Sequence, residues 1–166
     1  MKIAILSDIH SNLEALQACC RKAQILGVEQ YICLGDIIGY CADPVATLEL
    51  VMNLPGIVAV CGNHDKAVLS GNFPNARESV QQAIVWTRRQ LSEKHTDFIR
   101  SLPYSLHLQN IACAHASLYN PEQWQYLYQP DQVRQCMDAT QATLIFLGHT
   151  HLPILYYDNA MGHIKL

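Results

Sequence analysis

Short runs of hydrophobic residues alternate along the first part of the chain with longer stretches in which hydrophobic residues recur every three or four positions. A short continuous run is typical of a strand buried on both faces, and the longer repeat is typical of an amphipathic helix. The first helix is expected to follow its cap Asn12 and to end at Gly27, and the second to begin at Asp43-Pro44. Strands are expected at residues 2–6, 31–34 and 57–61, and later at 104–108, 111–114 and 143–147. The alternation of strand and helix predicts an α/β fold with a parallel sheet.

The hydrophobic pattern changes after Lys66. Residues 72–130 are expected to form a helical cover and a loop within a single domain that spans residues 1–166. Trp86 is expected in the core, and Ser92 is expected to cap a helix. The irregular, Tyr-rich stretch at residues 117–130 is expected to wall a cleft. The predicted elements are helices at 76–91 and 93–102, an irregular stretch at 117–130, a helix at 131–140, and a hairpin of residues 154–158 and 163–166 about a turn at 159–162.

Polar residues that can bind metals follow five of the predicted strands directly. In an α/β sheet, ligands bind at the carboxyl ends of the strands, so these side chains are expected to meet at one edge of the sheet. Oxygen and nitrogen donors without sulfur suit divalent Mn, Fe, Zn or Ni. The residues are Asp8, His10, Asp36, Asn63, His64, His115, His149 and His151.

Eight donors exceed what one tetrahedral ion binds, so we expect two divalent ions that share Asp36 as a bridging carboxylate. Two ions about 3.5–4 Å apart can clamp a phosphoryl group and hold the hydroxide that attacks it. His64 is left outside coordination and is predicted to act on the phosphate as general acid or electrostatic stabiliser, oriented by a hydrogen bond to Asp65. The ligands are assigned as Asp8, His10 and His151 to one ion, and Asn63, His115 and His149 to the other.

Each of these residues also has a purely structural interpretation. Asp8 and Asp36 can cap helices, and Asn63 can be a left-handed turn residue after a glycine. A single histidine is more often a surface or core residue than a ligand. The metal interpretation is favoured because five of the eight histidines follow strands in order. The histidines outside this pattern are interpreted as ordinary residues, namely His95, His107 and His163.

The polar residues form five ordered blocks: Asp8-x-His10, Gly35-Asp36, Gly62-Asn63-His64-Asp65, His115 and Gly148-His149-Thr150-His151. This set resembles the five signatures of the calcineurin-like metallophosphoesterase family, and the resemblance runs from Ser7 to about Pro153. The resemblance implies a sandwich of two mixed β-sheets flanked by helices, with a dinuclear site at the strand ends. It also implies Mn as a common activating ion and His64 as the catalytic histidine.

Two features depart from the family pattern. Protein phosphatases of the family carry Arg after the Gly-Asp and Asn-His blocks, where this chain has Ile-Ile-Gly-Tyr and Asp-Lys-Ala-Val. Because those arginines grip phosphate, their absence makes a protein phosphatase a less favoured prediction. Related chains usually continue beyond the last block with further strands, so the second sheet is expected to be short.

Composition narrows the class of protein. The chain has 166 residues, a formal net charge of −3 and no cluster of basic residues that would bind nucleic acid tightly. Seven cysteines without a CxxC spacing indicate a reduced, cytoplasmic protein, and no hydrophobic run is long enough to span a membrane.

The combined prediction is a hydrolase of phosphodiesters or small phosphomonoesters that uses attack by a metal-bound hydroxide. Two alternatives stay open: a nucleotide or dinucleoside polyphosphate hydrolase, and a non-catalytic protein-interaction module on the same fold. The expected partner is a small phosphoester substrate, and assembly into a homo-oligomer is compatible with the sequence.

Overall fold

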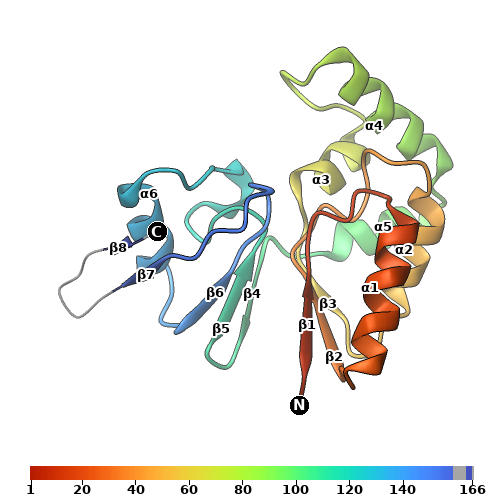
Figure 1. Ribbon diagram of the computed structural model, residues 1–166. Coiled ribbons are helices and arrows are strands. Elements are labelled where there is room, and N and C mark those ends of the chain that lie inside the picture. The colour runs from red at the N-terminus through yellow and green to blue at the C-terminus, as the bar shows by residue number, and fades with distance from the viewer. Residues whose placement is uncertain (159–163, 166) are drawn as a thin grey trace.

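Two β-sheets pack face to face in the computed structural model, which describes residues 1–158 and 164–165 (Figure 1). The first sheet has the order β1-β2-β3 and is parallel throughout, as the strand–helix alternation predicts. The second has the order β4-β5-β6, in which β5 is antiparallel to β4 and parallel to β6. Mixed strand direction is therefore confined to the second sheet. The strands are β1 (Ile3–Leu6), β2 (Gln30–Cys33), β3 (Val58–Ala59), β4 (Ser105–Leu108), β5 (Ile111–Ala114) and β6 (Leu144–Phe146).

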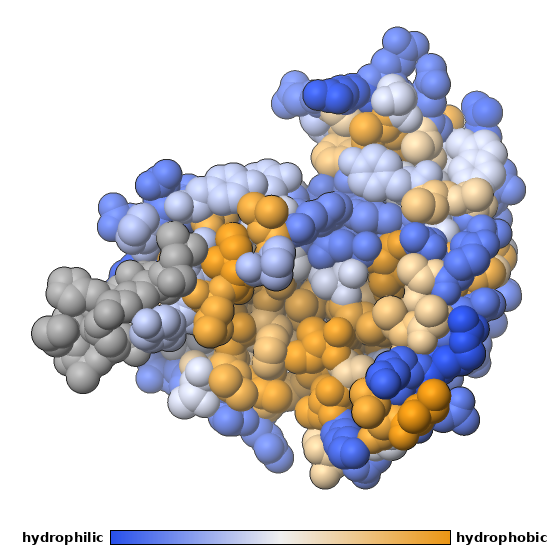
Figure 2. All heavy atoms as spheres, viewed as in Figure 1, coloured by the Kyte–Doolittle hydropathy of each residue, from blue (hydrophilic) through white to orange (hydrophobic). Residues whose placement is uncertain are grey.

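The interior between the sheets is built from alternate residues of the buried strands. Ile32 and Leu34, at and beyond the end of β2, pack against Cys113 of β5, and all three are almost fully buried. On the face shown in Figure 2, hydrophobic side chains gather along the junction of the two sheets. Among the described residues, no helix is sufficiently long and apolar to cross a membrane.

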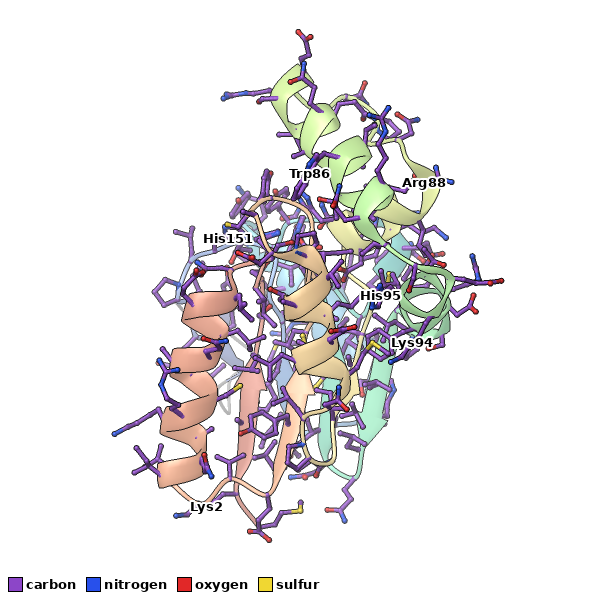
Figure 3. All side chains as sticks on the ribbon, turned by 90° about the vertical axis from the view of Figure 1, so that its right-hand side faces the viewer. Lys2, Trp86, Arg88, Lys94, His95 and His151 are labelled. Atoms are coloured by element: carbon purple, nitrogen blue, oxygen red, sulfur yellow. The ribbon has the colours of Figure 1, made fainter. Side chains whose placement is uncertain are left out.

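Helices α1 (Leu13–Ile25) and α2 (Pro44–Met52) cover the outer face of the first sheet (Figure 3). The predicted cap of α1 is confirmed, because the Asn12 side chain accepts a hydrogen bond from the Ala15 N–H at 3.1 Å. Asp43 precedes α2 with Pro44 at its first turn, as expected, but the Asp43 side chain makes no capping hydrogen bond. The buried side of α2, with Leu48 and Val51, therefore accounts for its position better than its cap does.

Helix α3 (Asn63–Ser70) was not expected, because its first turn consists of polar residues that look like a strand-end loop. Asp65 is the third helical residue, and its carboxylate accepts a hydrogen bond from the Gly62 N–H at 3.0 Å, which caps the helix. Asn63 is the first helical residue and has no positive φ, so its interpretation as a left-handed turn residue was wrong.

Helices α4 (Glu78–Gln90) and α5 (Glu93–Ser101) pack against α2 and α3 and reach the core through Ile84 and Ile99. Trp86 does not lie in the core as expected, since 43% of its surface is exposed. A residue two positions after Ile84 points to the other side of the helix, whereas Thr87 faces inward. Ser92 precedes α5 as predicted, and its backbone N–H donates to the ring of His95.

The second sheet is covered by α6 (Pro130–Asp138), whose Val133 and Cys136 are buried against residues near β6. The irregular stretch before it contains one short helix, η1 (Pro121–Gln123). The two strands of the predicted C-terminal hairpin pair antiparallel as β7 (Tyr157–Asp158) and β8 (Ile164–Lys165). The predicted turn at residues 159–162, and His163 beside it, lie outside the described residues.

Candidate metal centre

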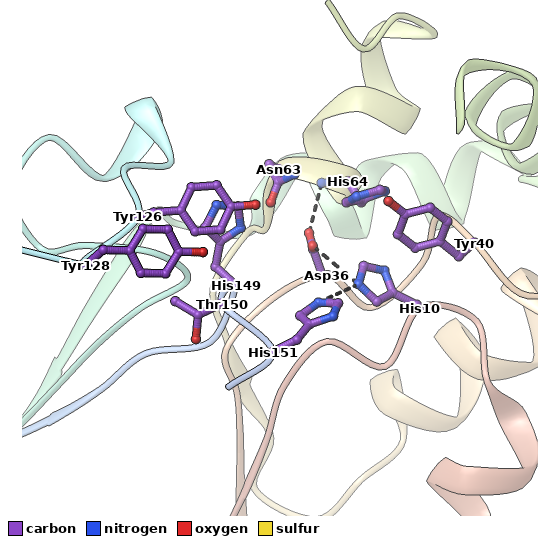
Figure 4. A pocket seen from close by; sticks show the side chains of 10 residues that line it. All are labelled: His10, Asp36, Tyr40, Asn63, His64, Tyr126, Tyr128, His149, Thr150 and His151. Atoms are coloured by element: carbon purple, nitrogen blue, oxygen red, sulfur yellow. Dashed lines mark hydrogen bonds and ion pairs between the residues drawn. The ribbon is translucent and has the colours of Figure 1, made fainter. Parts of the chain in front are cut away.

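The loops that follow the strands are tied to one another by backbone hydrogen bonds at one edge of the two sheets. The Asp8 N–H donates to the Gly35 carbonyl oxygen at 3.1 Å, and the His10 N–H donates to the Asp36 carbonyl oxygen at 2.9 Å. Across the second sheet, the Gly148 N–H donates to the His115 carbonyl oxygen at 2.8 Å. These bonds bring side chains from distant parts of the sequence into one pocket (Figure 4).

Five of the seven predicted metal ligands have a left-handed backbone conformation, with φ between 50° and 67°. Residues other than glycine rarely adopt it, and each such residue stores strain of about 1–3 kcal/mol when the surrounding structure enforces it. Strain of this kind concentrates at functional sites, and here it coincides with the predicted ligands. The five residues are Asp8, His10, Asp36, His149 and His151.

The first predicted ligand set lies together. The His151 Nε2 atom is 3.1 Å from the Asp8 carboxylate and 3.3 Å from the His10 Nε2 atom. Burial lowers the pKa of His10, although the charges of Asp36 and Asp8 oppose this effect, so its ring is neutral at neutral pH. Two facing imidazole nitrogens beside a carboxylate suit a cation, which a lone pair from each nitrogen can bind.

The second predicted set also lies together. The His115 Nδ1 atom is 2.8 Å from the Leu34 carbonyl oxygen, and its Nε2 atom is 2.9 Å from the Asn63 side-chain oxygen. An N–H donated to a backbone carbonyl directs the other ring nitrogen toward the site, as in many metal-binding histidines. The His149 Nε2 atom is buried and has no hydrogen-bond partner in the part of the chain that the structure describes.

Asp36 lies between the two sets. Its Oδ2 atom is 3.7 Å from the Nε2 atom of His10 and 3.3 Å from the Nε2 atom of His115. Burial opposes ionisation of Asp36, but the hydrogen bond and charge of His115 outweigh it and lower the pKa of the carboxyl group. Its Oδ1 atom accepts the His64 backbone N–H at 2.8 Å, so Asp36 also supports the first turn of α3.

The residues present fit divalent metal ions. Each of the clusters Asp8–His10–His151 and Asp36–His115–His149 offers ligand atoms that all lie within 4.8 Å of one another. Burial lowers the pKa of His149 to about 4, and the charge of His115 adds to this effect, so the ring is in the neutral form that coordination requires. The donor set contains no sulfur, in keeping with a borderline or hard cation.

His64 points into the same pocket and belongs to neither predicted set, although with His10 and Asp36 it offers a third group of ligand atoms that lie within 4.8 Å of one another. Its ring lies between those of Tyr40 and Phe73, with centroids 4.3 Å and 4.9 Å away, and against the backbone of Gly39. Burial lowers the pKa of His64 to about 4, and the neighbouring histidines add to this effect. The ring is therefore neutral at neutral pH, with one N–H available to donate.

Asp65 does not make the hydrogen bond to His64 that we predicted. Its carboxylate accepts the backbone N–H groups of Ile37 and Ile38 at 3.0 Å and 3.2 Å, in addition to that of Gly62. The His64 Nδ1 atom has no partner among residues 1–158 and 164–165. The prediction failed because Asp65 lies at the third position of a helix and turns back to cap it.

Several pocket residues were not singled out from the sequence. Tyr126 and Tyr128 come from the irregular stretch that was expected to wall a cleft, and the signal was its richness in tyrosine. Tyr40 follows Gly39 in the loop after β2, and nothing local distinguishes it. The pocket has a volume of about 210 Å³. Its lining consists of His10, Asp36, Tyr40, Asn63, His64, Tyr126, Tyr128, His149, Thr150 and His151.

Two sheets flanked by helices, with aspartate and histidine clustered at one edge, define a fold of the metallophosphoesterase class. The calcineurin-like phosphoesterase superfamily domain matches residues 1–164, and the chain belongs to this superfamily. This membership confirms the family expected from the five blocks of residues.

Individual relatives agree with this assignment. The chain is 38% identical to the uncharacterized protein MJ0912 of Methanocaldococcus jannaschii, over 99% of this chain and 67% of that protein. It is similar to the crystal structure of a metallophosphoesterase from Sphaerobacter thermophilus, with a TM-score of 0.82 and 35% identity over 95% of this chain and 63% of that one. Hypothetical protein PH1004 from Pyrococcus horikoshii OT3 shares the fold, with a TM-score of 0.81 and 21% identity over 98% of this chain and 74% of that one. The chain thus spans about two thirds of the length of the first two relatives.

Proposed function

We propose that this chain is a dinuclear metal-dependent phosphoesterase that hydrolyses phosphodiesters or small phosphomonoesters. The observation that carries the proposal is the position of Asp36, whose Oδ2 atom faces a histidine of each predicted ligand set. When bound, two divalent ions, with Mn as the first candidate, supply an activated water and neutralise the charge of the phosphate.

The predicted metal ligands fall into two sets, one for each ion. Asp8, His10 and His151 would hold one ion, and Asn63, His115 and His149 would hold the other, with Asp36 between the two sets. The Leu34 carbonyl fixes the ring of His115 so that its Nε2 atom faces the site.

His64 acts on the substrate in this proposal, because its ring lines the pocket and belongs to neither set. Its N–H is available to the phosphate or to the leaving oxygen, and proton donation there assists departure of the alcohol. Asp65 acts indirectly, since it ties the loop after β2 to the start of α3 and thereby positions Asp36 and His64.

The experiment is turnover of bis-p-nitrophenyl phosphate by purified protein with added Mn²⁺, together with measurement of bound metal. We expect Asp36→Asn to lose affinity for both ions, and His64→Ala to keep its metal and lose at least about tenfold in kcat. The matched control is His107→Ala, an exposed histidine on β4 outside the pocket. Metal-loaded protein that turns over neither this compound nor any other generic phosphoester would contradict the proposal.

A second candidate substrate class is nucleotides or dinucleoside polyphosphates. Its support is the stacked pair of Tyr126 and Tyr128, whose rings are nearly parallel at 10° with centroids 5.2 Å apart. Tyr128 is 53% exposed and offers a surface on which a base can stack. A substrate panel that includes nucleotides and simple esters distinguishes the two candidates.

A further inference from the structure

The ring of His64 is held in place by packing. Its Nδ1 atom is buried and has no hydrogen-bond partner within the described residues. Three rings surround it, those of His10, Tyr40 and Phe73. The backbone of Gly39 closes the Nδ1 edge, since a Cβ atom added to this glycine would lie 2.8 Å from Nδ1. The direction in which the His64 ring points therefore depends on how firmly these neighbours are held.

Phe73 reaches His64 because the chain reverses direction after α3. His64 is the second residue of this helix, and about 9 Å of helix separates it from the last residue, Ser70. The reversal begins at Gly71, which has a φ of +71° and whose N–H donates to the Ala67 carbonyl oxygen at 2.8 Å. The Phe73 ring then meets the His64 ring nearly at a right angle, at 89°, with centroids 4.9 Å apart.

One side chain of α4 holds the loop that carries Phe73. The Gln81 Oε1 atom accepts the Phe73 backbone N–H at 2.8 Å, and the Gln81 Nε2 atom donates to the Gly71 carbonyl oxygen at 3.0 Å. Helices α3 and α4 pack against each other, and α4 lies on the outside of the molecule (Figure 1). Two hydrogen bonds from one planar amide fix both the position and the direction of the loop. Helix α4 is thereby connected to His64 through Phe73.

We propose that Gln81 and Phe73 are positioning residues for His64: Gln81 fixes the loop, and Phe73 sets the direction of the histidine ring. The inference rests on the proposed phosphoesterase function, in which His64 acts on the substrate. Neither Gln81 nor Phe73 lines the pocket, so their effect on the rate passes through His64. A catalytic group that is misplaced by about 1 Å loses on the order of 100-fold in rate, so even a smaller displacement is measurable.

The test replaces Gln81 by methionine, which keeps the length of the side chain and removes both hydrogen bonds. We expect Gln81→Met to retain its metal, to keep KM for bis-p-nitrophenyl phosphate within about twofold and to lower kcat about tenfold. The matched control is Gln82→Met at the adjacent position, where the exposed glutamine donates to the Glu78 carboxylate at 3.2 Å. Its kcat is expected to change by less than about twofold.

Combination with His64→Ala separates positioning from a general loss of structure. If Gln81 acts through His64, Gln81→Met lowers kcat by less than about twofold in the His64→Ala background. Phe73→Leu is a second variant, for which the same pattern is expected. Its control is Phe98→Leu, because Phe98 packs against the same core cluster from α5 and is not one of the rings around His64.

NMR tests the position of the His64 ring without turnover. In protein loaded with Zn²⁺, which is diamagnetic, the ring protons of His64 are assigned by their absence from the His64→Ala variant. A nuclear Overhauser cross-peak to the Phe73 ring is expected in wild type, because the centroids lie 4.9 Å apart. The cross-peak should weaken in Gln81→Met and persist in Gln82→Met.

A Gln81→Met protein with the kcat and the cross-peak of wild type, or equal losses of kcat with and without His64, would overturn the inference while leaving the phosphoesterase function intact. Absence of turnover on every ester, with metal bound, would instead remove that function. The cross-peak would then still decide whether Gln81 holds Phe73 against His64.

Discussion

Replacing Gly39 by alanine tests whether the loop after β2 positions His64. Gly39 has a φ of +126°, a conformation that is open to glycine and strained for other residues. A Cβ atom at this position would lie 2.8 Å from both the Cβ and the Nδ1 atoms of His64. The contact is too short to persist, so the His64 ring or the loop must move.

Two contributions determine how far Gly39→Ala lowers the free energy of unfolding. Backbone strain costs about 1–3 kcal/mol, and the steric contact adds about 1–3 kcal/mol, so the free energy of unfolding is expected to fall by roughly 2–6 kcal/mol. A displacement of a catalytic group by about 1 Å costs on the order of 100-fold in rate. Bound metal is expected to stay unchanged, because His64 is outside both predicted ligand sets.

The assays are urea denaturation, metal content and turnover of bis-p-nitrophenyl phosphate. Gly27→Ala is the matched control, since Gly27 also has a positive φ, +69°, but has no atom within 4 Å of an added Cβ. It is expected to cost only the strain, roughly 1–2 kcal/mol, with unchanged kcat.

The effects of substitutions at Gly39 and His64 on stability are expected to be coupled. Gly39→Ala should cost less stability in a His64→Ala background, where the contact with the ring is absent. A Gly39→Ala protein as active and as stable as Gly27→Ala, or equal costs in both backgrounds, would refute it.

Three further predictions concern stability. Asp65→Ala should destabilise the fold by roughly 3–5 kcal/mol in urea, because three buried N–H groups lose their acceptor, whereas Asp97→Ala at an exposed ion pair should cost less than about 1 kcal/mol. After treatment with a chelator, added Mn²⁺ should raise the melting temperature of the protein, with about 2.7 kcal/mol of stabilisation at a concentration 100 times Kd. Most of this gain should be absent in Asp36→Asn. An unchanged melting temperature in the wild-type protein would contradict the metal centre. Burial raises the pKa of Cys33 to about 12 and that of Cys113 to about 11, so these thiols stay protonated in the folded protein while unfolded thiols ionise near 9.0. Stability should therefore fall as the pH rises above about 9, and a Cys33→Ala/Cys113→Ala variant with an undiminished slope would show that these thiols are not the cause.

Much of the fold could be predicted because its signals are local. Runs of hydrophobic residues predict buried strands, the Asn12 cap marks the start of α1, and the alternation of strand and helix leads to a parallel sheet. The candidate ligands could be found for a related reason: Asp and His repeatedly follow the strand runs, and the carboxyl ends of parallel strands meet at one edge. That these residues bind two ions stays a prediction.

Other features depend on contacts between segments that are distant in sequence, and local sequence patterns do not predict such contacts. Asp65 accepts the N–H groups of Ile38 and Ile37, which lie 27 and 28 positions away, and this tie to the loop after β2 cannot be predicted from its neighbours in sequence. Trp86 is half exposed because the packing of α4 on its neighbours, rather than its hydrophobic character, decides which side of the helix is buried.

By itself, then, the sequence determined the approximate positions of the strands, the parallel direction of those in the first sheet and the set of candidate ligands, since each depends on neighbours along the chain. Only the tertiary structure put the Tyr126 ring against His149 and the Tyr40 ring against His64. The physical reason is that such contacts arise from the packing of whole sheets and loops, in which the position of each side chain is set by residues remote from it in sequence.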